Sequence, residues 1–348
     1  MTFGAGPIPA KIMLVGEVWG YEEERTGQPF VGESGKELNR MLHEAGIMRS
    51  EVYCTNVINA RPPYGNLNKW IPLKKSEATR EHSAIVRGRY VSPQVAEGVA
   101  SLHKELAMVK PNLVIAAGAT ALWAMTGKSK ITHWRGSTMI GDTGHKVLAL
   151  IHPAAIMRMW AMRPTTVNDL RRVRRESMTP GLQIPEWKFK IDPTFDEVLQ
   201  TLADLQAMIE AGPTWIDFDL ETFAGHIKCA GLSWSRLEAI CIPFVRQVSV
   251  TDKKLVDAWN EEAEAEIVWR LWKLLTHPNC WVRGQNLLYD SQYTYRHWHF
   301  IPNVKQDTML SMHTAFAGMK KSLDFQASMF CQYYCQWKPE RGVTKDGG

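Results

Sequence analysis

Acidic side chains alternate with apolar ones in the segment WIDFDLET. In an extended strand, residues two apart point to the same side, so Asp217, Asp219 and Glu221 share one face. Their apolar neighbours are typical of a buried strand, where an ionised carboxylate is costly unless it is paired or bound to a metal ion. The segments GQNLLYD, which ends at Asp290, and QDTML, which contains Asp307, supply two further acids. The pattern therefore indicates carboxylates that are either paired or gathered around a cation.

A second candidate site lies near the start of the chain, where GEVWGYEEE is followed by GQPFVG. This loop runs from Gly16 to Gly32, follows an apolar segment, and is rich in glycine, carboxylates and aromatic rings. Such a loop can hold a small planar ligand. It is a poor phosphate cradle, because carboxylates repel phosphate and the P-loop pattern of glycines followed by Gly-Lys-Ser or Gly-Lys-Thr is not present.

The elements that would position this loop alternate between strands and helices. We predict strands at Lys11–Val15, Val52–Ile58, Asn112–Ala117 and Lys146–Ile151, and helices at Gly35–Ala45, Val95–Val109 and Ala119–Met125. Such alternation predicts an α/β fold in three layers, with a mostly parallel sheet between helices. Ligands in such folds bind at the carboxyl ends of the strands. Residues 16–35, 56–68 and 152–158 all follow such ends, so one cleft can collect them.

The chain is expected to form two domains, residues 1–178 and 194–348, joined by a proline-containing linker at 179–193. The second domain is predicted to combine a strand meander with helices, at Thr194–Ala211 (helix), Thr214–Leu220, Cys229–Trp234 and Ala239–Val245 (strands), Glu261–Thr276 (helix), Trp281–Arg283 (strand) and from Leu288 (helix). A further helix of the first domain is predicted to run to about Ser177, and four arginines lie at its end: Arg171, Arg172, Arg174 and Arg175. Cations are favourable at a helix C-terminus, and we favour this role over a dedicated DNA contact.

The composition places the chain among globular proteins. Its 348 residues suit two domains, and the 45% hydrophobic and 22% charged fractions are ordinary. No apolar run approaches the roughly 20 residues that cross a bilayer, and no secretion signal is recognised. Six cysteines without a CxxC pair indicate reduced thiols and a cytoplasmic location, in the host cytoplasm if the protein is phage-encoded. The net charge of +5 permits a polyanionic partner but does not demand one.

Three motifs in the first half resemble those of the family-4 and family-5 uracil-DNA glycosylases, in the same order. The loop from Gly16 to Gly32 is similar to that family's GEAPG, acidic pair and PFVG sequence. The segment YCTN, which ends at Asn56, and the RPP that follows it resemble a second motif. HPAAIMR, from His152 to Arg158, resembles a third. The resemblance covers about residues 10–175, and it implies a domain that recognises uracil in DNA.

The resemblance also implies roles for single residues. A uracil must be flipped out of the base stack before a tight pocket can read it. Phe30 would stack on the flipped base, and Asn56 would read its polar edge through an amide that both donates and accepts. His152 would donate a hydrogen bond to the uracil O2 as negative charge develops there. The remaining implied roles are Gly16 in the uracil pocket, Glu17 or Asn66 as the group that positions the attacking water, and Arg158 as a phosphate contact.

Several positions depart from that family. Family 4 holds a 4Fe–4S cluster with four cysteines, but Ala60 and Gly98 stand where two of them belong, and Cys54 is the one cysteine in this half. We therefore expect no iron–sulfur cluster. Trp19 replaces the proline of the first motif and places a bulky ring at the pocket mouth, and Val18 offers no acid to activate water. The alternative hypothesis is a pocket that binds DNA or senses uracil without cleavage.

The second half resembles the proofreading exonuclease domain of family-A DNA polymerases, which belongs to the DEDD nucleases and has a ribonuclease-H-like fold. The strings DLET, GQNLLYD and DTML, followed by SLD, occur there in the same order, over about residues 190–335. The resemblance implies that Asp219, Glu221 and Asp290 bind Mg²⁺ or Mn²⁺, which prefer oxygen ligands. Two such ions would activate water and stabilise the leaving 3′ oxygen. By the same resemblance Asn286 steadies the ligands, and Asp307 is a structural cap.

The third motif of that family, Tyr-x-x-x-Asp, has no match here. No aspartate stands four residues after Tyr333 or Tyr334, and the sequence printed above ends in KDGG. We therefore expect a second domain that is incomplete at its C-terminus, within the N-terminal portion of a phage-type family-A polymerase. The leading hypothesis is a DNA-processing enzyme that inspects DNA for uracil and trims 3′ ends. A single-strand-binding platform that uses some of the 14 tryptophans for stacking is an alternative, as is a uracil sensor.

Overall fold

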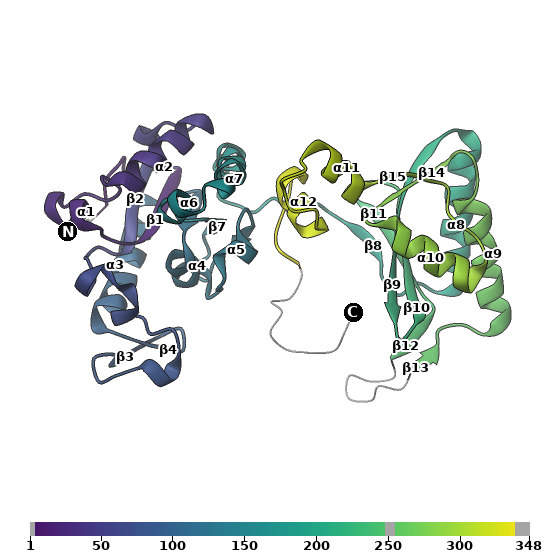
Figure 1. The fold of residues 1–348 in the computed structure, drawn as a ribbon, viewed down its shortest axis with the longest axis horizontal. Helices are drawn as coiled ribbons and strands as arrows, with labels where there is room; N and C mark the ends of the chain where they lie inside the picture. Colours follow the sequence, from purple (N-terminus) through teal and green to yellow (C-terminus); the bar gives the residue numbers. More distant parts are fainter. Residues whose placement is uncertain (1–3, 248–254, 338–348) are drawn as a thin grey trace. The chain divides into compact units, whose positions relative to one another are not determined.

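The chain divides into two compact units in a computed structural model that describes residues 4–247 and 255–337 (Figure 1). The first unit contains the described residues up to Ile184 together with a segment that begins at Ala327, and the second unit runs from Pro185 to Gln326. No helix in the described part of the chain has both the length and the apolar character that a bilayer crossing requires.

The first unit is built on a five-stranded sheet with the order β2-β1-β5-β7-β6. The first four strands are parallel, and β6 is antiparallel to β7. In chain order the strands are β1 (Ile12–Val18), β2 (Val52–Ile58), β5 (Leu113–Ala117), β6 (Thr138–Ile140) and β7 (Lys146–Leu150). The helices are α1 (Tyr21–Thr26), α2 (Glu33–Glu44), α3 (Pro93–Val109), α4 (Ala119–Thr126), α5 (Ile131–Trp134), α6 (Pro153–Arg158) and α7 (Arg163–Glu176).

Alternation along β1 explains the three layers of this unit. Met13 and Val15 point to one face and pack with residues of α3 and α4, whereas Ile12 and Leu14 point to the other face and pack with residues of α2 and α7. Both faces of a parallel strand are therefore buried, as its continuous apolar run predicts. A small hairpin, β3 (Ala84–Val86) with β4 (Arg89–Val91), and five short 3-10 helices complete the unit: Arg49–Glu51, Pro63–Gly65, Leu67–Lys69, Lys75–Glu77 and Trp160–Met162.

The second unit has a six-stranded mixed sheet with the order β15-β14-β9-β10-β11-β8. Strands β9, β10 and β11 form an antiparallel meander, and β14 and β15 continue parallel to β9. The strands are β8 (Lys188–Lys190), β9 (Thr214–Phe223), β10 (His226–Ser233), β11 (Glu238–Pro243), β14 (Cys280–Gly284) and β15 (Val304–Asp307), with a separate ribbon of β12 (Val245–Gln247) and β13 (Leu255–Asp257). The meander followed by two parallel strands is the order of a ribonuclease-H-like fold. The predicted fold class, two α/β domains, is confirmed.

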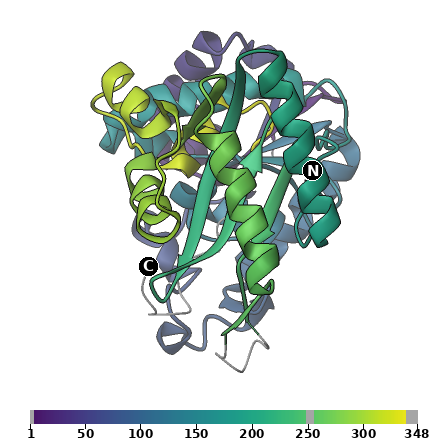
Figure 2. The ribbon, with the colours of Figure 1, turned by 90° about the vertical axis from the view of Figure 1, so that its right-hand side faces the viewer.

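Helices α8 (Phe195–Ala211) and α9 (Glu261–Leu275) cover one face of this sheet. Figure 2 looks onto them as they lie side by side across the strands. Ile216, Phe218 and Leu220 of β9 point into this core and are buried, so the acids between them lie on the opposite face. The remaining helices are α10 (Leu287–Trp298), α11 (Thr308–Ala315) and α12 (Leu323–Phe330).

Two segments lie elsewhere than the sequence predicts. Strand β8 falls inside the predicted linker, yet it pairs in parallel with β11 and forms one edge of the second sheet. Residues 327–337, predicted to belong to the second domain, are part of the first unit. We call residues 327–337 the C-terminal segment.

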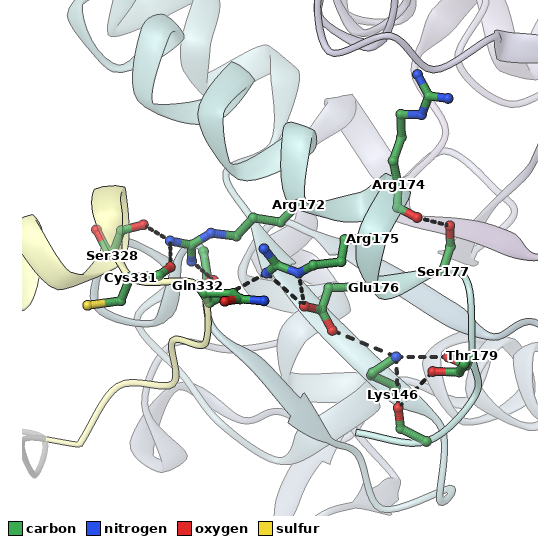
Figure 3. Close-up of polar contacts among 12 residues, drawn as sticks. Lys146, Arg172, Arg174, Arg175, Glu176, Ser177, Thr179, Ser328, Cys331 and Gln332 are labelled. Atoms are coloured by element: carbon green, nitrogen blue, oxygen red, sulfur yellow. Dashed lines mark hydrogen bonds and ion pairs between the residues drawn. The ribbon is translucent and has the colours of Figure 1, made fainter. Parts of the chain in front are cut away.

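Arginines of α7 hold the C-terminal segment (Figure 3). The Arg172 guanidinium donates to the carbonyl oxygens of Ser328 and Cys331, and Arg175 donates to that of Gln332 at 2.5 Å. Carbonyls at the end of a helix have no partner within the helix, and here arginines supply one. Arg172 and Arg175 therefore bind carbonyl oxygens at the end of α12. The sequence predicted only that these cations favour the C-terminus of their own helix. Arg174 points away from this contact in the figure.

The same segment extends the edge of the first sheet. The Thr138 amide donates to the Tyr334 carbonyl oxygen at 2.9 Å, and the Gln336 amide donates to Ser137 Oγ at 3.1 Å. Beneath it, the fully buried Asp169 accepts two hydrogen bonds from Arg135. Burial raises the pKa of Asp169, and the Arg135 charge opposes this rise. The C-terminal segment thus covers a buried ionic network and an otherwise open strand edge.

Candidate functional site

A cavity of about 520 Å³ opens at the carboxyl ends of β1, β2 and β7 in the first unit. The three loops predicted to meet do meet there. Five residues selected from the sequence line this one cavity: Glu17, Phe30, Asn56, His152 and Arg158. Trp19 and Val18, the two departures in the first motif, line it as well.

Gly16 is the point on which two of these side chains converge. It lies at the end of β1, directly opposite Asn56 of β2 in the parallel register. A Cβ atom on Gly16 would overlap Asn56 Oδ1 and would lie 2.6 Å from Phe30 Cζ. Only a glycine therefore lets the amide and the aromatic ring approach each other here.

The Phe30 ring is fixed before any ligand arrives. It is 7% exposed, and its backbone is left-handed, with φ 58°. The first turn of α2 packs so closely on the Phe30 carbonyl that Gly35 has no room for a side chain. The ring lies 6.0 Å from the His152 ring at an interplanar angle of 30°. The two rings form one wall of the cavity.

His152 begins α6 and is held in a defined protonation state. The Ala154 amide donates to His152 Nδ1 at 3.2 Å, so Nδ1 is an acceptor and the hydrogen of a neutral imidazole is on Nε2. Burial lowers the pKa of His152, and the carboxylate of Glu17 partly opposes this effect. The cavity therefore contains a neutral imidazole whose Nε2–H is a donor.

Glu17 is held by the start of α4. Its Oε1 accepts from the Thr120 amide at 3.0 Å. Gly118 brings the helix close, because a Cβ there would lie 2.6 Å from the same oxygen. The N-terminal amides of a helix favour an anionic partner, so the carboxylate orientation is fixed by backbone.

Glu23 organises the loop, and sequence reasoning did not single it out among the neighbouring acids. It is buried, its Oε2 accepts from the Gly20 amide at 3.1 Å, and its Oε1 accepts from Val31 and Gly32 at 3.1 and 3.0 Å. These bonds tie the two ends of the glycine-rich loop together beside Phe30. Its position three residues after Gly20, at the start of a helix, is the sequence signal that identifies it.

Asn66 does not join the other predicted site residues. It is exposed, it is not among the residues that line the cavity, and its Oδ1 accepts from the Asn68 amide at 3.0 Å. It begins the short helix Leu67–Lys69. Of the two predicted water-positioning residues, the structure places Glu17 at the cavity.

An iron–sulfur cluster does not fit the residues of this part of the chain. Cys54 is the one cysteine in residues 4–184, and it is buried in β2. Burial raises the pKa of its thiol to about 12, which disfavours the thiolate that a metal requires. A Cβ on Gly98 would overlap the Val57 carbonyl oxygen, so this helix position has no room for a cysteine.

The acids of the second unit are distributed among separate partners. Asp217 forms a two-point ion pair with Arg283 of the neighbouring strand, at 2.5 and 2.9 Å, which removes it from the group of available carboxylates. Asp219 lines a cavity of about 460 Å³ on the face of the sheet opposite α8 and α9. Asp290 Oδ1 accepts from the Leu220 amide at 2.7 Å. Burial and, to a smaller extent, the charge of Asp219 raise the pKa of Asp290 to about 6.

The predicted metal ligands are therefore not assembled as a site. Within residues 4–247 and 255–337, no group of three or more His, Cys, Asp and Glu side chains is arranged to hold a metal ion. Asp219, Glu221 and Asp290, as their side chains lie, do not form the three-carboxylate site expected from the sequence. The KDGG residues at positions 345–348, used above in the argument for a missing motif, lie outside the described residues.

The two supporting residues stand at helix starts. Asp307 precedes α11 and accepts from Met309 at 2.8 Å and Leu310 at 3.3 Å. It also accepts from Asn286 at 3.1 Å and Leu287 at 2.8 Å, at the start of α10. One carboxylate thus caps two helices. Asn286 itself has a left-handed backbone, with φ 60°.

Comparison with known proteins gives matches for the first unit. The family model described as uracil DNA glycosylase superfamily matches residues 3–173. A type-4 uracil-DNA glycosylase from Thermotoga maritima is 32% identical over 180 residues, which are 51% of this chain and 79% of that protein. A second type-4 uracil-DNA glycosylase, from Sulfurisphaera tokodaii, is 30% identical over 186 residues, 51% of this chain and 74% of that protein.

Solved structures give weaker likenesses. The catalytic core of RRP6 from Trypanosoma brucei has a TM-score of 0.31 and 17% identity, over 43% of this chain and 36% of that chain. Escherichia coli RNase D, an exoribonuclease, has a TM-score of 0.27 and 12% identity, over 41% and 33%. The match spans about a third of each of those chains. The strand order of the second sheet, and not these likenesses, supports its ribonuclease-H-like fold.

Proposed function

The chain belongs to the uracil-DNA glycosylase superfamily, and from this premise we propose that its first unit binds a uracil flipped out of DNA and cleaves the bond between that base and its sugar. The proposal rests on one observation. Phe30, Asn56 and His152 come from three separate segments and line one cavity, and Phe30 and Asn56 meet over Gly16, which has no room for a side chain. An aromatic face, an amide and a ring donor are the groups that a flat base with polar edges requires.

The proposed chemistry is electrostatic. As the glycosidic bond breaks, the departing uracil gains negative charge. A neutral imidazole with its hydrogen on Nε2 donates to this charge without having to be deprotonated, and the Ala154 amide fixes that orientation. Preorganised donors of this kind are typically worth about 10²–10³ in rate.

Glu17 is the proposed partner of the attacking water. One of its oxygens is held by the Thr120 amide, and the carboxylate lines the same cavity as His152. The second oxygen is then available to accept from a water molecule and to orient it. Arg158, also at the cavity, is proposed to bind a flanking phosphate.

The test is release of uracil from a single-stranded oligonucleotide with one deoxyuridine. The intact chain is expected to leave an abasic site that alkali cleaves, and Phe30→Ala and His152→Ala are each expected to lose about 10²-fold or more in rate. Far-UV circular dichroism of both variants checks that they are folded. A folded wild-type protein without uracil release would refute cleavage.

Trp19 supports a second candidate, a sensor that binds uracil without cleaving it. Its indole lines the cavity where related proteins have a proline, so it reduces the space beside the base. A sensor would bind deoxyuridine-containing DNA more tightly than the same sequence with thymidine, and it would release no base. Trp19→Pro would then be expected to gain cleavage.

For the second unit we propose cleavage of DNA from the 3′ end with Mg²⁺ or Mn²⁺. The support is the ribonuclease-H-like strand order, the acids on one face of β9, and a cavity that Asp219 lines. A 5′-labelled oligonucleotide would shorten in the presence of Mn²⁺, and Asp219→Ala would abolish the shortening. A polymerase in the same natural chain, with this unit as its proofreading nuclease, is the finer form of the proposal. Sequencing the natural reading frame beyond Gly348 tests that form.

A further inference from the structure

Tyr64 presents its ring to solvent on a fixed turn. The residue is 95% exposed and has a left-handed backbone, with φ 56° and ψ 18°. Residues with a Cβ adopt this conformation at an energetic cost, so the backbone at Tyr64 is strained. The Gly65 amide donates to Pro62 O at 2.9 Å, and the Asn66 amide donates to Pro63 O at 3.0 Å. Two prolines and two hydrogen bonds therefore fix the direction of the chain on either side of Tyr64.

This turn stands at the rim of the uracil cavity. Arg61 and Gly65, on the two sides of Tyr64 in the sequence, both line that cavity. Tyr21 is another exposed ring there, but the Arg61 guanidinium lies 5.6 Å from its centroid. Arg61 also pairs with Glu24 at 3.5 Å. In the described part of the chain the Tyr64 ring has no aromatic, cationic or hydrogen-bonding partner.

We infer that Tyr64 stacks on a base next to the flipped uracil in single-stranded DNA, and this inference rests on the function proposed above. A base that turns into the cavity leaves its neighbour with one face unstacked. An aromatic ring at the rim can take the vacated position, and stacking of this kind tolerates any base, because every base has a π-face. Tyr64 is thus a positioning residue for the strand, since it does not line the cavity that receives the uracil.

This position predicts a particular kinetic signature. Stacking on a neighbouring base contributes equally before and during bond cleavage, so its loss raises KM and leaves kcat nearly unchanged. Free uracil contacts the cavity alone, so its inhibition of the reaction is expected to be independent of Tyr64.

The experiment compares Tyr64→Gly with Tyr64→Phe in the full chain. Glycine suits the left-handed turn, so the first variant removes the ring without threatening the fold, and phenylalanine keeps the stacking surface. The probe is a single-stranded oligonucleotide with 2′-fluoro-deoxyuridine, which resists cleavage, and 2-aminopurine on its 5′ or 3′ side. Wild type and Tyr64→Phe are expected to quench the 2-aminopurine fluorescence in one of the two oligonucleotides. Tyr64→Gly is expected to lose that quenching and to bind about 5- to 100-fold more weakly.

The outcomes separate this inference from the proposed function. If the wild type releases uracil while Tyr64→Gly quenches, binds and turns over like the wild type, Tyr64 does not stack and the inference is overturned. A drop in kcat at unchanged KM and unchanged affinity overturns it as well. If the wild type releases no uracil, the proposed cleavage fails, and the fluorescence difference between the glycine and phenylalanine variants still decides the role of Tyr64.

Discussion

The cavity at the carboxyl ends of β1, β2 and β7 in the first unit differs from the acidic face of the second unit, the side of β9 that carries Asp217, Asp219 and Glu221, in how closely its side chains are packed together. In the first, Phe30 and Asn56 pack closely against Gly16, Phe30 packs against Gly35, and the His152 imidazole is buried and neutral. In the second, Asp217 is paired with Arg283, Asp290 accepts from the Leu220 amide, and the charge of Asp219 raises the pKa of Asp290. The difference follows from charge. Neutral donors and rings can be packed together in advance, whereas carboxylates repel one another unless a cation lies between them.

The largest expected effect is a loss of stability of the first unit when its contact with the C-terminal segment is removed. Arg172 is 7% exposed and joins α7 to the C-terminal segment beside the buried Asp169. Arg172→Ala removes the donor to three carbonyl oxygens, those of Gly136, Ser328 and Cys331. Each buried acceptor left without a partner costs about 1–3 kcal/mol, so we expect the first unit to lose about 3 kcal/mol or more. Calorimetry of the full chain measures this loss. Arg174→Ala is the matched control, because Arg174 is exposed, and it should change stability by less than about 0.5 kcal/mol. Equal effects of the two changes would show that the C-terminal segment does not support this unit.

A smaller effect is expected when a methyl group is added at Gly16, where Phe30 and Asn56 meet. Gly16→Ala would push Phe30 and Asn56 apart, because the added methyl overlaps both. A displacement of about 1 Å at a reacting site can cost roughly 100-fold in rate, so uracil release should fall by about that factor. Gly181→Ala is the control, since a Cβ there would meet only the Gln183 side chain, at 3.9 Å. Unchanged release by Gly16→Ala would mean that the cavity is not preassembled.

The acidic face is expected to bind a divalent cation, because oxygen ligands suit Mn²⁺. Mn²⁺ at ten times its dissociation constant is expected to stabilise the second unit by about 1.4 kcal/mol, through binding to the folded form alone. Thermal unfolding with and without Mn²⁺ measures the shift. Asp219→Asn should remove it, and Glu262→Gln, the same charge change at an exposed site on α9, should not. A shift that survives Asp219→Asn would place the ion elsewhere.

The smallest effect is the pH dependence of His152. Its folded pKa lies below the ordinary value of 6.5, so the unfolded chain takes up this proton more readily. The stability that the neutral ring contributes is complete above pH 6.5 and is lost as the pH falls toward the folded pKa. Uracil release should therefore persist to a lower pH than a histidine of ordinary pKa would allow. Glu17, Glu23 and Arg158 are the charged groups that act on the ring. NMR titration of the His152 ring, with His152→Asn to assign the signal, would contradict this if its pKa were 6.5 or higher.

The sequence predicted most of the fold because its signals are local. The predicted helix Val95–Val109 is part of α3 (Pro93–Val109), and the predicted strand Val52–Ile58 is β2 with the same limits. The helix follows from apolar residues at helical spacing between Pro93 and Pro111, and the strand follows from a short apolar run before Arg61-Pro62-Pro63. Five site residues were brought to one cavity because the carboxyl ends of parallel strands share an edge.

What the sequence did not predict depends on contacts between distant residues. Arg172 could not be assigned to Ser328 and Cys331, which are more than 150 residues away along the chain. Glu23 was not distinguished from Glu22 and Glu24, because its burial and its bonds to the Val31 and Gly32 amides, eight and nine residues away, appear only in the folded structure. The three metal ligands were implied by the family resemblance, and a resemblance does not reveal that Asp217 pairs with Arg283 or that Asp290 accepts from a backbone amide.

The position of the C-terminal segment has a consequence for biosynthesis. A ribosome completes residues up to Ile184 and must then add about 140 more before Ala327 is made. At about 5–20 residues per second, the nascent first unit waits roughly 7–30 s with the outer edge of β6 uncovered and Arg172 without the Ser328 and Cys331 carbonyls. The amino-terminal unit of this polypeptide is thus the first to be translated but cannot be the first to finish folding.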